Sequence, residues 1–263
     1  MSDARQRLWQ TARPLVHLGR AALRFVFPPS CPLCQADAED HAGDSECHPI
    51  TPMLCGQCLG DVLIPRGNRC RRCGLPVGPH VRSDHGCPMC VSHKFRFQQV
   101  IRFGLYDDAL RQACIRAKAT TQFPLAAALA NLLWLSEQLD LEAANVDVVA
   151  PVPCHWTRRM LRPHHAAETI SRVLSGRLGK PLQRRLLRKK RLTSDQSDLP
   201  AAKRRLNLKD AFAVSPYSRS LAGKTVLLVD DILTTGTTAN ECTRTLLHAG
   251  AKQVVVAVIA VVP

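Results

Sequence analysis

The second half of the chain alternates apolar runs with segments of helical periodicity. The runs Val146 to Pro153, Thr225 to Val229 and Gln253 to Val262 are apolar almost throughout. Such runs are typical of strands buried on both faces of a sheet. A further strand is predicted from Gln98 to Tyr106, where side chains alternate with a period of two. We expect a short strand at Phe212 to Val214.

Helices are expected between these strands. They are predicted from Asp107 to about Ala117, and at Phe123 to Leu139, Ala166 to Leu178, Pro181 to Leu187 and Thr237 to Ala249. Asp107 is a suitable N-cap, and Gly250 closes the last helix. Arg188 to Lys209 is polar and aperiodic, so a long loop is expected there. Strands alternating with helices predict an α/β fold with a parallel sheet and right-handed crossovers.

The N-terminal segment is rich in arginine and nearly free of acidic residues. Residues 1–27 are expected to form one or two short helices that end at Pro28 and Pro29. An organelle-targeting peptide or a membrane-surface helix would look similar. We favour a helix packed on the rest of the protein, because Pro14 interrupts the pattern and no cleavage motif follows. No apolar run approaches the about 20 residues of a membrane-spanning helix, so a cytoplasmic protein is expected.

Cysteine is concentrated in one part of the chain. Nine of the twelve cysteines lie between Cys31 and Cys90, where periodic apolar residues are few. Such a segment is held by something other than a hydrophobic core. We therefore predict an N-terminal helical segment at 1–28, a cysteine-rich module at 29–95 and an α/β domain at 96–263.

Eight of these cysteines form four pairs with a two-residue gap. The pairs are Cys31/Cys34, Cys55/Cys58, Cys70/Cys73 and Cys87/Cys90. Each turn presents two thiolates at the separation that tetrahedral zinc requires, which predicts a double zinc ribbon with two structural zinc ions. Pairing in chain order is favoured, and the alternative is a cross-braced arrangement of pairs one with three and two with four. Disulfides would need an oxidising compartment, and a redox dithiol is normally a single pair. Cys47 remains unassigned, as a spare thiol or a substitute ligand.

The balance of charge indicates a polyanionic partner. The formal net charge is +15 and the sequence pI is about 9.7. Nucleic acid, a phosphorylated substrate or an anionic membrane surface would each fit. The densest run of cations extends from Arg184 to Arg191. Aromatic residues are sparse, which weakens base stacking but leaves contact with a nucleic-acid backbone open.

The most informative segment runs from Val226 to Thr238. Its apolar strand is followed by Asp230 and Asp231, at the end of the strand where open α/β sheets bind ligands. A Thr-Thr-Gly-Thr-Thr turn then leads into a helix, so backbone amides, hydroxyl groups and a positive helix end converge. That combination cradles a phosphate. The two carboxylates need a polyol or a metal ion as partner, and a ribose diol with Mg²⁺ nearby would meet that need.

This motif resembles the binding loop of type I phosphoribosyltransferases. The resemblance implies that Asp230 and Asp231 bind the ribose hydroxyl groups at the catalytic centre. It also implies a 5′-phosphate site for phosphoribosyl pyrophosphate (PRPP), formed by Thr234, Thr235, Gly236, Thr237 and Thr238. Arg158 and Arg159 would face the pyrophosphate, and Lys118 would belong to the same site. Displacement of pyrophosphate depends on positioning and charge neutralisation rather than on a protein nucleophile.

Together with the zinc pairs, the motif resembles the ComF (competence protein F) family and its GntX-like relatives. The matching residues also include Lys118 in Ile-Arg-Ala-Lys, Val-Ala-Pro-Val-Pro at 149–153, Arg158, Arg159, Arg191-Leu-Thr with Gln196, and Arg205-x-Asn207 with Ala211-Phe212. The implied fold is a type I phosphoribosyltransferase-like parallel sheet flanked by helices and preceded by a zinc ribbon module. One segment departs from the family. Arg162-Pro-His-His-Ala166 replaces the usual Arg-Gly-Phe-Asn-Gln, and its proline removes a backbone donor.

Three functions are compatible with these motifs. The first is a phosphoribosyltransferase, a pentosyl-transferring enzyme associated with DNA uptake in natural transformation, which acts on an unidentified base or amine. The second is a non-catalytic protein that binds a phosphoribosyl ligand or a nucleotide end and holds single-stranded DNA through its zinc ribbons and basic loop. The third is an interaction protein with a vestigial ligand pocket, in which the zinc ribbons dock partner machinery such as the DNA-uptake machinery.

Overall fold

The computed structural model describes most of the α/β region and both sets of cysteine pairs. The described residues are 30–36, 54–63, 67–81, 86–119, 121–154, 165–190, 208, 210–216, 218 and 220–263. Several sequence-based expectations fall outside them: the N-terminal helices, Cys47, Arg158, Arg159, Arg162 to His164, and the loop from Arg191 to Asn207.

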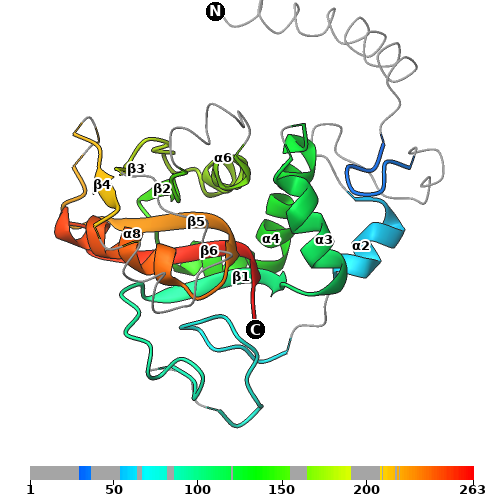
Figure 1. Ribbon diagram of the computed structural model, residues 1–263, viewed down its shortest axis with the longest axis horizontal. Coiled ribbons are helices and arrows are strands. Elements are labelled where there is room, and N and C mark those ends of the chain that lie inside the picture. The colour runs from blue at the N-terminus through cyan, green and yellow to red at the C-terminus, as the bar shows by residue number, and fades with distance from the viewer. Residues whose placement is uncertain are drawn as a thin grey trace, which may run out of the picture.

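A parallel sheet of four strands lies at the centre of the protein (Figure 1). The strands are β1 (Gln99–Leu105), β2 (Val148–Pro151), β5 (Thr225–Leu233) and β6 (Gln253–Val261), in the order β1-β6-β5-β2. Every neighbouring pair is parallel. The predicted α/β class and its four main strands are therefore confirmed.

Two apolar layers cover the faces of this sheet. Along β6, Val255, Ala257 and Ile259 face a layer that contains α3 (Asp108–Ala117), α4 (Phe123–Ala143) and α6 (Ala166–Leu178). Val254, Val256 and Val258 face the opposite layer, which contains α8 (Thr237–His248). The alternation follows from the period of two along a strand, and it explains why these runs are apolar without interruption.

The segment after α6 was predicted wrongly. Pro181 to Leu187 is not helical, because Val149 of β2 exchanges backbone hydrogen bonds with it: the Val149 amide donates to the Pro181 carbonyl (3.0 Å) and the Gln183 amide to the Val149 carbonyl (2.9 Å). The chain then forms strand β3 (Leu187–Lys189), across the end of the predicted helix and the start of the predicted loop. β3 pairs antiparallel with β4 (Phe212–Val214), the short strand that was expected.

Two further details differ at helix ends. Asp107 precedes α3 but makes no side-chain capping hydrogen bond. The cysteine-rich region, in which few periodic apolar residues were found, contains the helix α2 (Gly56–Val62), whose N-cap is Cys55. The Cys55 sulfur accepts a hydrogen bond from the Cys58 amide at 3.4 Å, so a thiol takes the place of the usual hydroxyl or carboxylate cap.

Candidate functional site

The predicted phosphate loop lies between β5 and α8. β5 ends at Leu233 and α8 begins at Thr237, with Gly236 as its N-cap. Gly236 has a φ of 71°, a left-handed conformation that glycine adopts without steric cost. The first turn of α8 holds no acidic residue and no side-chain cap. The backbone amides at the start of α8 therefore point into the space in front of the helix, where they would stabilise a bound anion.

The loop is pinned by two hydrogen bonds of its own. The hydroxyl oxygens of Thr235 and Thr237 lie 2.8 Å apart, and the Asn240 amide donates to the Gly236 carbonyl at 2.8 Å. Thr234 is exposed, whereas Thr237 and Thr238 are half-buried. The five residues predicted to bind the 5′-phosphate thus form one compact turn, and the structure brings them together.

The paired acids lie inside β5, which is four residues longer than the sequence predicted. Each carboxylate accepts a hydrogen bond from the next backbone amide: Asp231 N to Asp230 Oδ1 at 2.9 Å, and Ile232 N to Asp231 Oδ1 at 2.8 Å. The paired backbone of β5 and these bonds restrict both side chains, which is useful in a site that must meet a rigid ribose ring.

Lys118 reaches the same place from another element. It follows the last turn of α3, and its Nζ lies 3.4 Å from Asp231 Oδ2. The side chains are 44% and 22% exposed, so both remain accessible to a ligand. The structure therefore brings Lys118 next to Asp231, and its part in ligand binding stays a prediction. Arg158 and Arg159 lie outside the described residues.

The two acids are not electrostatically equivalent. Burial raises the pKa of Asp230 well above its usual range, and the charge of Asp231 adds to this effect. Burial also raises the pKa of the Cys114 thiol to about 12, with Asp231 adding to the rise. The pair is therefore a focus of negative potential that a cation or hydroxyl donors would stabilise.

Phe95 belongs to this site, although no motif drew attention to it. Its ring lies directly on Gly236, so a β-carbon at that position would be 2.9 Å from Phe95 Cε1. The only available signal was its place, five residues after the last cysteine of the ribbon. From the sequence alone, an aromatic residue at this position fits the hydrophobic core as well as it fits a ligand site.

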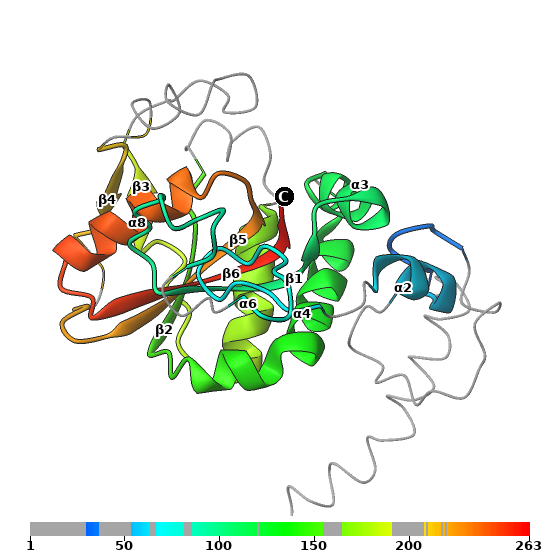
Figure 2. The same ribbon diagram turned by 90° about the horizontal axis from the view of Figure 1, so that it is seen from below.

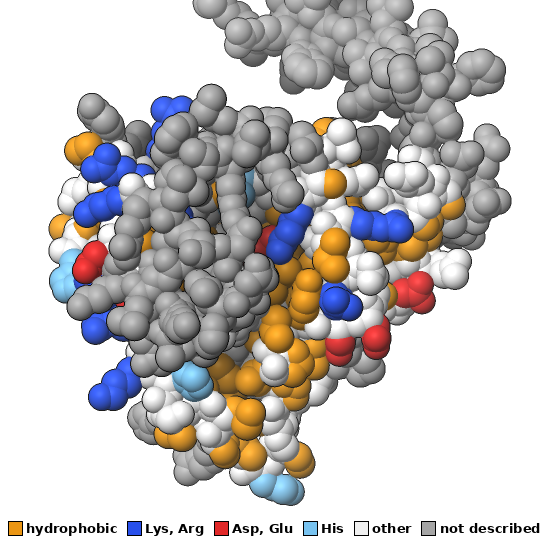
Figure 3. Space-filling view, in the orientation of Figure 1, with side chains coloured by type: hydrophobic (Ala, Val, Ile, Leu, Met, Phe, Trp, Pro, Cys, Tyr) orange, Lys and Arg blue, Asp and Glu red, His pale blue; other side chains and the backbone are white. Residues whose placement is uncertain are grey.

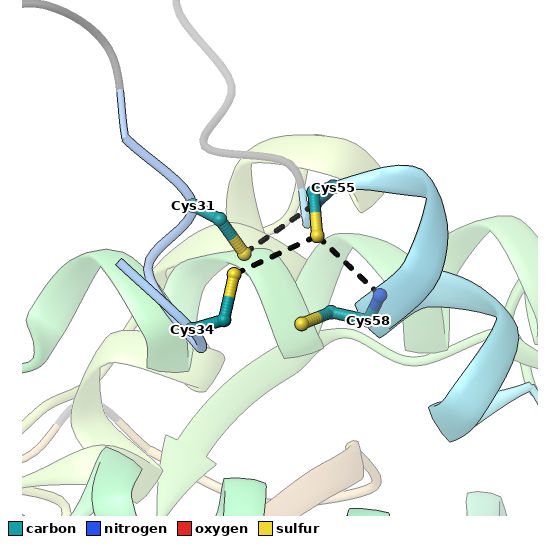
Figure 4. A group of neighbouring side chains, drawn as sticks. All are labelled: Cys31, Cys34, Cys55 and Cys58. Atoms are coloured by element: carbon teal, nitrogen blue, oxygen red, sulfur yellow. Dashed lines mark hydrogen bonds between the residues drawn. The ribbon is translucent and has the colours of Figure 1, made fainter. Parts of the chain in front are cut away.

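The first cysteine cluster consists of Cys31, Cys34, Cys55 and Cys58 (Figure 4). The sulfurs of Cys34 and Cys55 are 3.7 Å apart, and the Cys55 amide donates to the Cys31 sulfur at 3.4 Å. A tetrahedron around zinc at about 2.3 Å has edges of about 3.8 Å, so the four sulfurs fit this ion. A disulfide would require about 2.05 Å.

The second cluster consists of Cys70, Cys73, Cys87 and Cys90, all buried. Sulfur separations of 3.8 Å for Cys70–Cys90, 3.7 Å for Cys73–Cys87 and 3.8 Å for Cys87–Cys90 again match a zinc tetrahedron. The two groups confirm pairing in chain order and exclude the cross-braced alternative. Such closed four-thiolate sites are structural: each residue supplies a ligand, and no coordination position is left for a substrate.

The two clusters attach to different parts of the α/β region. The first packs against α3 in one apolar cluster, and Arg116 of α3 donates to the Leu33 carbonyl. The second lies next to β1 (Figure 2), where the Val100 amide donates to the Arg71 carbonyl at 2.8 Å. Arg69 of this segment pairs with Glu137 and with Asp140 of α4, the latter at 2.7 Å. The first cluster thus contacts α3, whose C-cap is Lys118, and the chain that follows the second cluster contacts Gly236 through Phe95.

Comparison with known proteins defines the class of the α/β region. Residues 167–263 match the phosphoribosyl transferase domain family. This match covers α6, the phosphate loop and the last two strands, so this part of the chain is similar to phosphoribosyl transferase domains. It does not extend to β1 or to the cysteine clusters, which are nevertheless continuous with the same sheet and its apolar layers.

The relatives extend the similarity to most of the chain. The protein is 29% identical to competence protein F of Haemophilus influenzae over 217 residues, which cover 76% of this chain and 93% of that protein. It is 28% identical to the DNA utilization protein YhgH of Salmonella typhi over 204 residues, covering 76% and 87%. The resemblance to the competence protein F family is confirmed.

Solved structures are more distant. Glutamine PRPP amidotransferase from B. subtilis is 25% identical, covers 51% of this chain and 26% of its own, and superposes with a TM-score of 0.34. A purine phosphoribosyltransferase from Pyrococcus horikoshii is 18% identical and superposes with a TM-score of 0.30, and the match covers 51% of this chain and 69% of that protein's chain.

Among the described residues, no helix has both the length and the apolar character needed to cross a membrane.

Proposed function

We propose that this protein binds a phosphoribosyl ligand of the PRPP type at Asp230 to Thr238 and that it acts in the handling of incoming DNA. The observation that carries the proposal is the position of the acid pair, within β5 and directly before a glycine turn that opens α8. In this arrangement the ribose hydroxyl groups would donate to Asp230 and Asp231 while the 5′-phosphate accepts from the turn. The DNA link is supported by the names of its relatives, a competence protein and a DNA utilization protein.

Lys118 and Mg²⁺ would complete the charge balance. PRPP carries a negatively charged pyrophosphate, which the two carboxylates would repel. The ammonium group of Lys118, at the end of α3, lies 3.4 Å from Asp231 and would offset this repulsion. A Mg²⁺ ion on the pyrophosphate would add further compensation. Arg158 and Arg159 are proposed as additional pyrophosphate contacts. Transfer to an acceptor base or amine would then proceed by positioning and electrostatic stabilisation.

Calorimetric titration with PRPP and Mg²⁺ tests the binding site. Replacement of Asp230→Ala together with Asp231→Ala should weaken binding by at least about a hundredfold, because each lost hydrogen bond to a charged acceptor is worth about 1.5–3 kcal/mol. The control Asp61→Ala with Glu142→Ala removes two exposed acids elsewhere and should bind normally. Unchanged affinity in the first variant would refute the assignment. Pyrophosphate release across a panel of bases, with and without single-stranded DNA, then tests turnover.

A second candidate function is binding of single-stranded DNA, and one observation favours it. Arg185, Arg188 and Lys190 are exposed on and beside β3, and Lys and Arg side chains gather along the edge of the molecule that carries β3 and β4 (Figure 3). Such a stripe of cations could follow a phosphodiester backbone.

A cytoplasmic location is part of the proposal, since a reducing compartment keeps eight cysteines available to zinc. The zinc ribbons would also present surfaces to the DNA-uptake machinery.

A further inference from the structure

We propose that Phe95 is a positioning residue that couples the metal centre at Cys70, Cys73, Cys87 and Cys90 to the phosphate loop. The inference builds on the proposed function, because it assigns the second zinc ribbon a role in shaping the ligand site. It rests on a continuous set of contacts that begins at the cysteines and ends at Gly236.

The contacts start at the last cysteine knuckle. The Val91 amide donates to the Cys87 carbonyl at 2.8 Å and the His93 amide to the Cys90 carbonyl at 2.9 Å, so the chain leaving the cluster follows its turn closely. The Phe95 amide donates to the His93 carbonyl at 2.9 Å, and the Phe95 side chain packs against the cysteine cluster itself. A metal ion that fixes Cys87 and Cys90 therefore fixes the path of the chain to Phe95.

The other knuckle holds Phe95 as well. Arg72, between Cys70 and Cys73, donates from its guanidinium to the Phe95 carbonyl. The ring of Phe95 is stacked between His93, at a centroid distance of 5.3 Å, and Phe97, at 4.7 Å. Phe97 is completely buried in the apolar layer on the α8 side of the sheet. Both pairs of cysteines and the core thus determine where the Phe95 ring lies.

The ring then forms one wall of the phosphate loop. It occupies the volume that a side chain at position 236 would take, with Cε1 2.9 Å from a hypothetical β-carbon. Gly236 is needed here for this contact and for its positive φ. Nearby, the Arg96 amide donates to Asn240 Oδ1 at 2.6 Å, which ties the same ribbon segment to the first turn of α8.

These contacts give the ribbon a mechanical part in binding. The turn from Thr234 to Gly236 must hold several donors around one phosphate, and its geometry is supported from outside by Phe95 and Arg96. Without that support the turn would sample other conformations, and part of the binding free energy would be spent on ordering it. A zinc ion held by Cys70, Cys73, Cys87 and Cys90 would therefore influence the ligand site through the packing of Phe95, without touching the ligand.

The test compares the zinc-loaded full-length protein with its Phe95→Ala and Phe95→Leu variants. We expect hydrogen exchange of the backbone amides at 236–240 to accelerate about tenfold in Phe95→Ala and less in Phe95→Leu. PRPP affinity should fall by a similar factor, while zinc content stays at the wild-type value. Met89→Ala, on the exposed side of the same ribbon, is the matched control and should change neither. Wild-type exchange at 236–240 in the folded Phe95→Ala protein would overturn the inference.

A pair of cysteine variants separates this inference from general loss of structure. Cys87→Ser with Cys90→Ser should accelerate the same amides, whereas Cys31→Ser with Cys34→Ser should leave them unchanged. Equal acceleration in both would mean that the loop responds to destabilisation of any kind, which contradicts the proposal. If exchange responds as expected but the wild-type protein does not bind PRPP, the coupling stands and the proposed ligand is wrong.

Discussion

Asp230 and Asp231 are neighbours in sequence but have different surroundings. Asp231 faces Lys118 and contributes to the raised pKa of Cys114 in α3, while Asp230 contributes to the raised pKa of buried Cys242 in α8. The period of two along β5 sends the two side chains toward different layers. Only Asp231 has a cation within salt-bridge distance among the described residues. Asp230 thus bears an electrostatic cost that a ligand with hydroxyl donors would relieve.

This cost predicts that Asp230→Asn stabilises the free protein while it weakens ligand binding. Because burial raises the pKa of Asp230 in the folded state, the folded protein retains this proton more strongly than the unfolded chain. The free energy of unfolding therefore falls as the pH rises from the unfolded value of about 3.9 toward the raised folded value. The asparagine variant lacks this loss, so its melting temperature at pH 7 should exceed that of wild type by a few degrees.

Calorimetric melting from pH 4 to pH 8 checks the sign. The advantage of the variant should be smallest at pH 4 and should grow across the window in which Asp230 ionises. PRPP affinity of the wild type should rise over the same window, since the ionised carboxylate is the better acceptor. Asp231→Asn serves as the comparison, because it removes the Lys118 ion pair and should not stabilise. A lower melting temperature for Asp230→Asn at pH 7 would contradict the account.

Among the elements, the β3–β4 pair is small, and exposed cations lie on and beside its first strand. Leu187 and Phe212 are buried and hold the two strands on the apolar layer. Arg188 points outward between them, and Lys189 lies 6.0 Å from the centroid of the Phe212 ring. The backbone of β3 is held by its hydrogen bonds to β4 and by the burial of Leu187 and Phe212. The cations of β3 therefore project from a fixed strand and not from a free loop.

From this arrangement we predict that the hairpin contributes to binding of single-stranded DNA. Replacement of Arg185, Arg188 and Lys190 by Ala should reduce affinity by about one to two orders of magnitude at low salt. It should also lower the slope of log K against log salt by about 2, since each phosphate contact on a single strand contributes about 0.7. Fluorescence anisotropy with a labelled oligonucleotide measures both.

The control for this prediction removes two cations that do not belong to the hairpin. Arg111 is in α3 and Lys252 precedes β6, and both side chains are exposed, so the control variant is Arg111→Ala with Lys252→Ala. Its binding should stay within about twofold of wild type. If both variants lose affinity equally, the interaction depends on net charge and not on the hairpin.

At this same scale the sequence predicted the regular elements well and the short ones poorly. The runs that became β5 and β6 are apolar on both faces, so their identity did not depend on tertiary contacts. Leu187 to Lys189 has no such pattern and becomes a strand because Phe212 to Val214 lies beside it. The seven residues of α2 depend on a thiol cap and on packing of Val62 against α3. Phe95 was missed for the same reason: its role arises from a contact that spans 141 positions of the chain.

On the scale of the whole molecule, the cysteine clusters support the candidate site from two sides. The first contacts α3, whose C-cap is Lys118, and the second contacts the phosphate loop through Phe95. The grouping of the eight cysteines in chain order could be predicted from the sequence, because each two-residue gap places two thiols together; that the groups hold zinc stays a prediction. The separate attachment of the two groups to the sheet could not be predicted, since it depends on where α3 and α8 lie.

Metal content tests this arrangement directly. We expect two zinc ions per chain by elemental analysis, and removal of both by a strong chelator should lower the melting temperature by at least about 10 °C, because metal-binding free energy is folding free energy in such sites. Zinc release should accelerate as the pH falls from 8 to 6. Zinc is bound by thiolates, so protons compete with the metal for the cysteine sulfurs as the pH falls. A stoichiometry near one would show that one cluster does not hold zinc.

The order of the strands in the sheet affects how the protein can fold during translation. β6 lies between β1 and β5, yet it follows every other strand in the chain. β1 is synthesised early, but its partner β6 leaves the ribosome only after almost the whole polypeptide has been made. In that interval the apolar edges of β1 and β5 are unpaired, a condition that invites aggregation and calls for chaperones. A message truncated before codon 253 would yield an insoluble product instead of a partly active one.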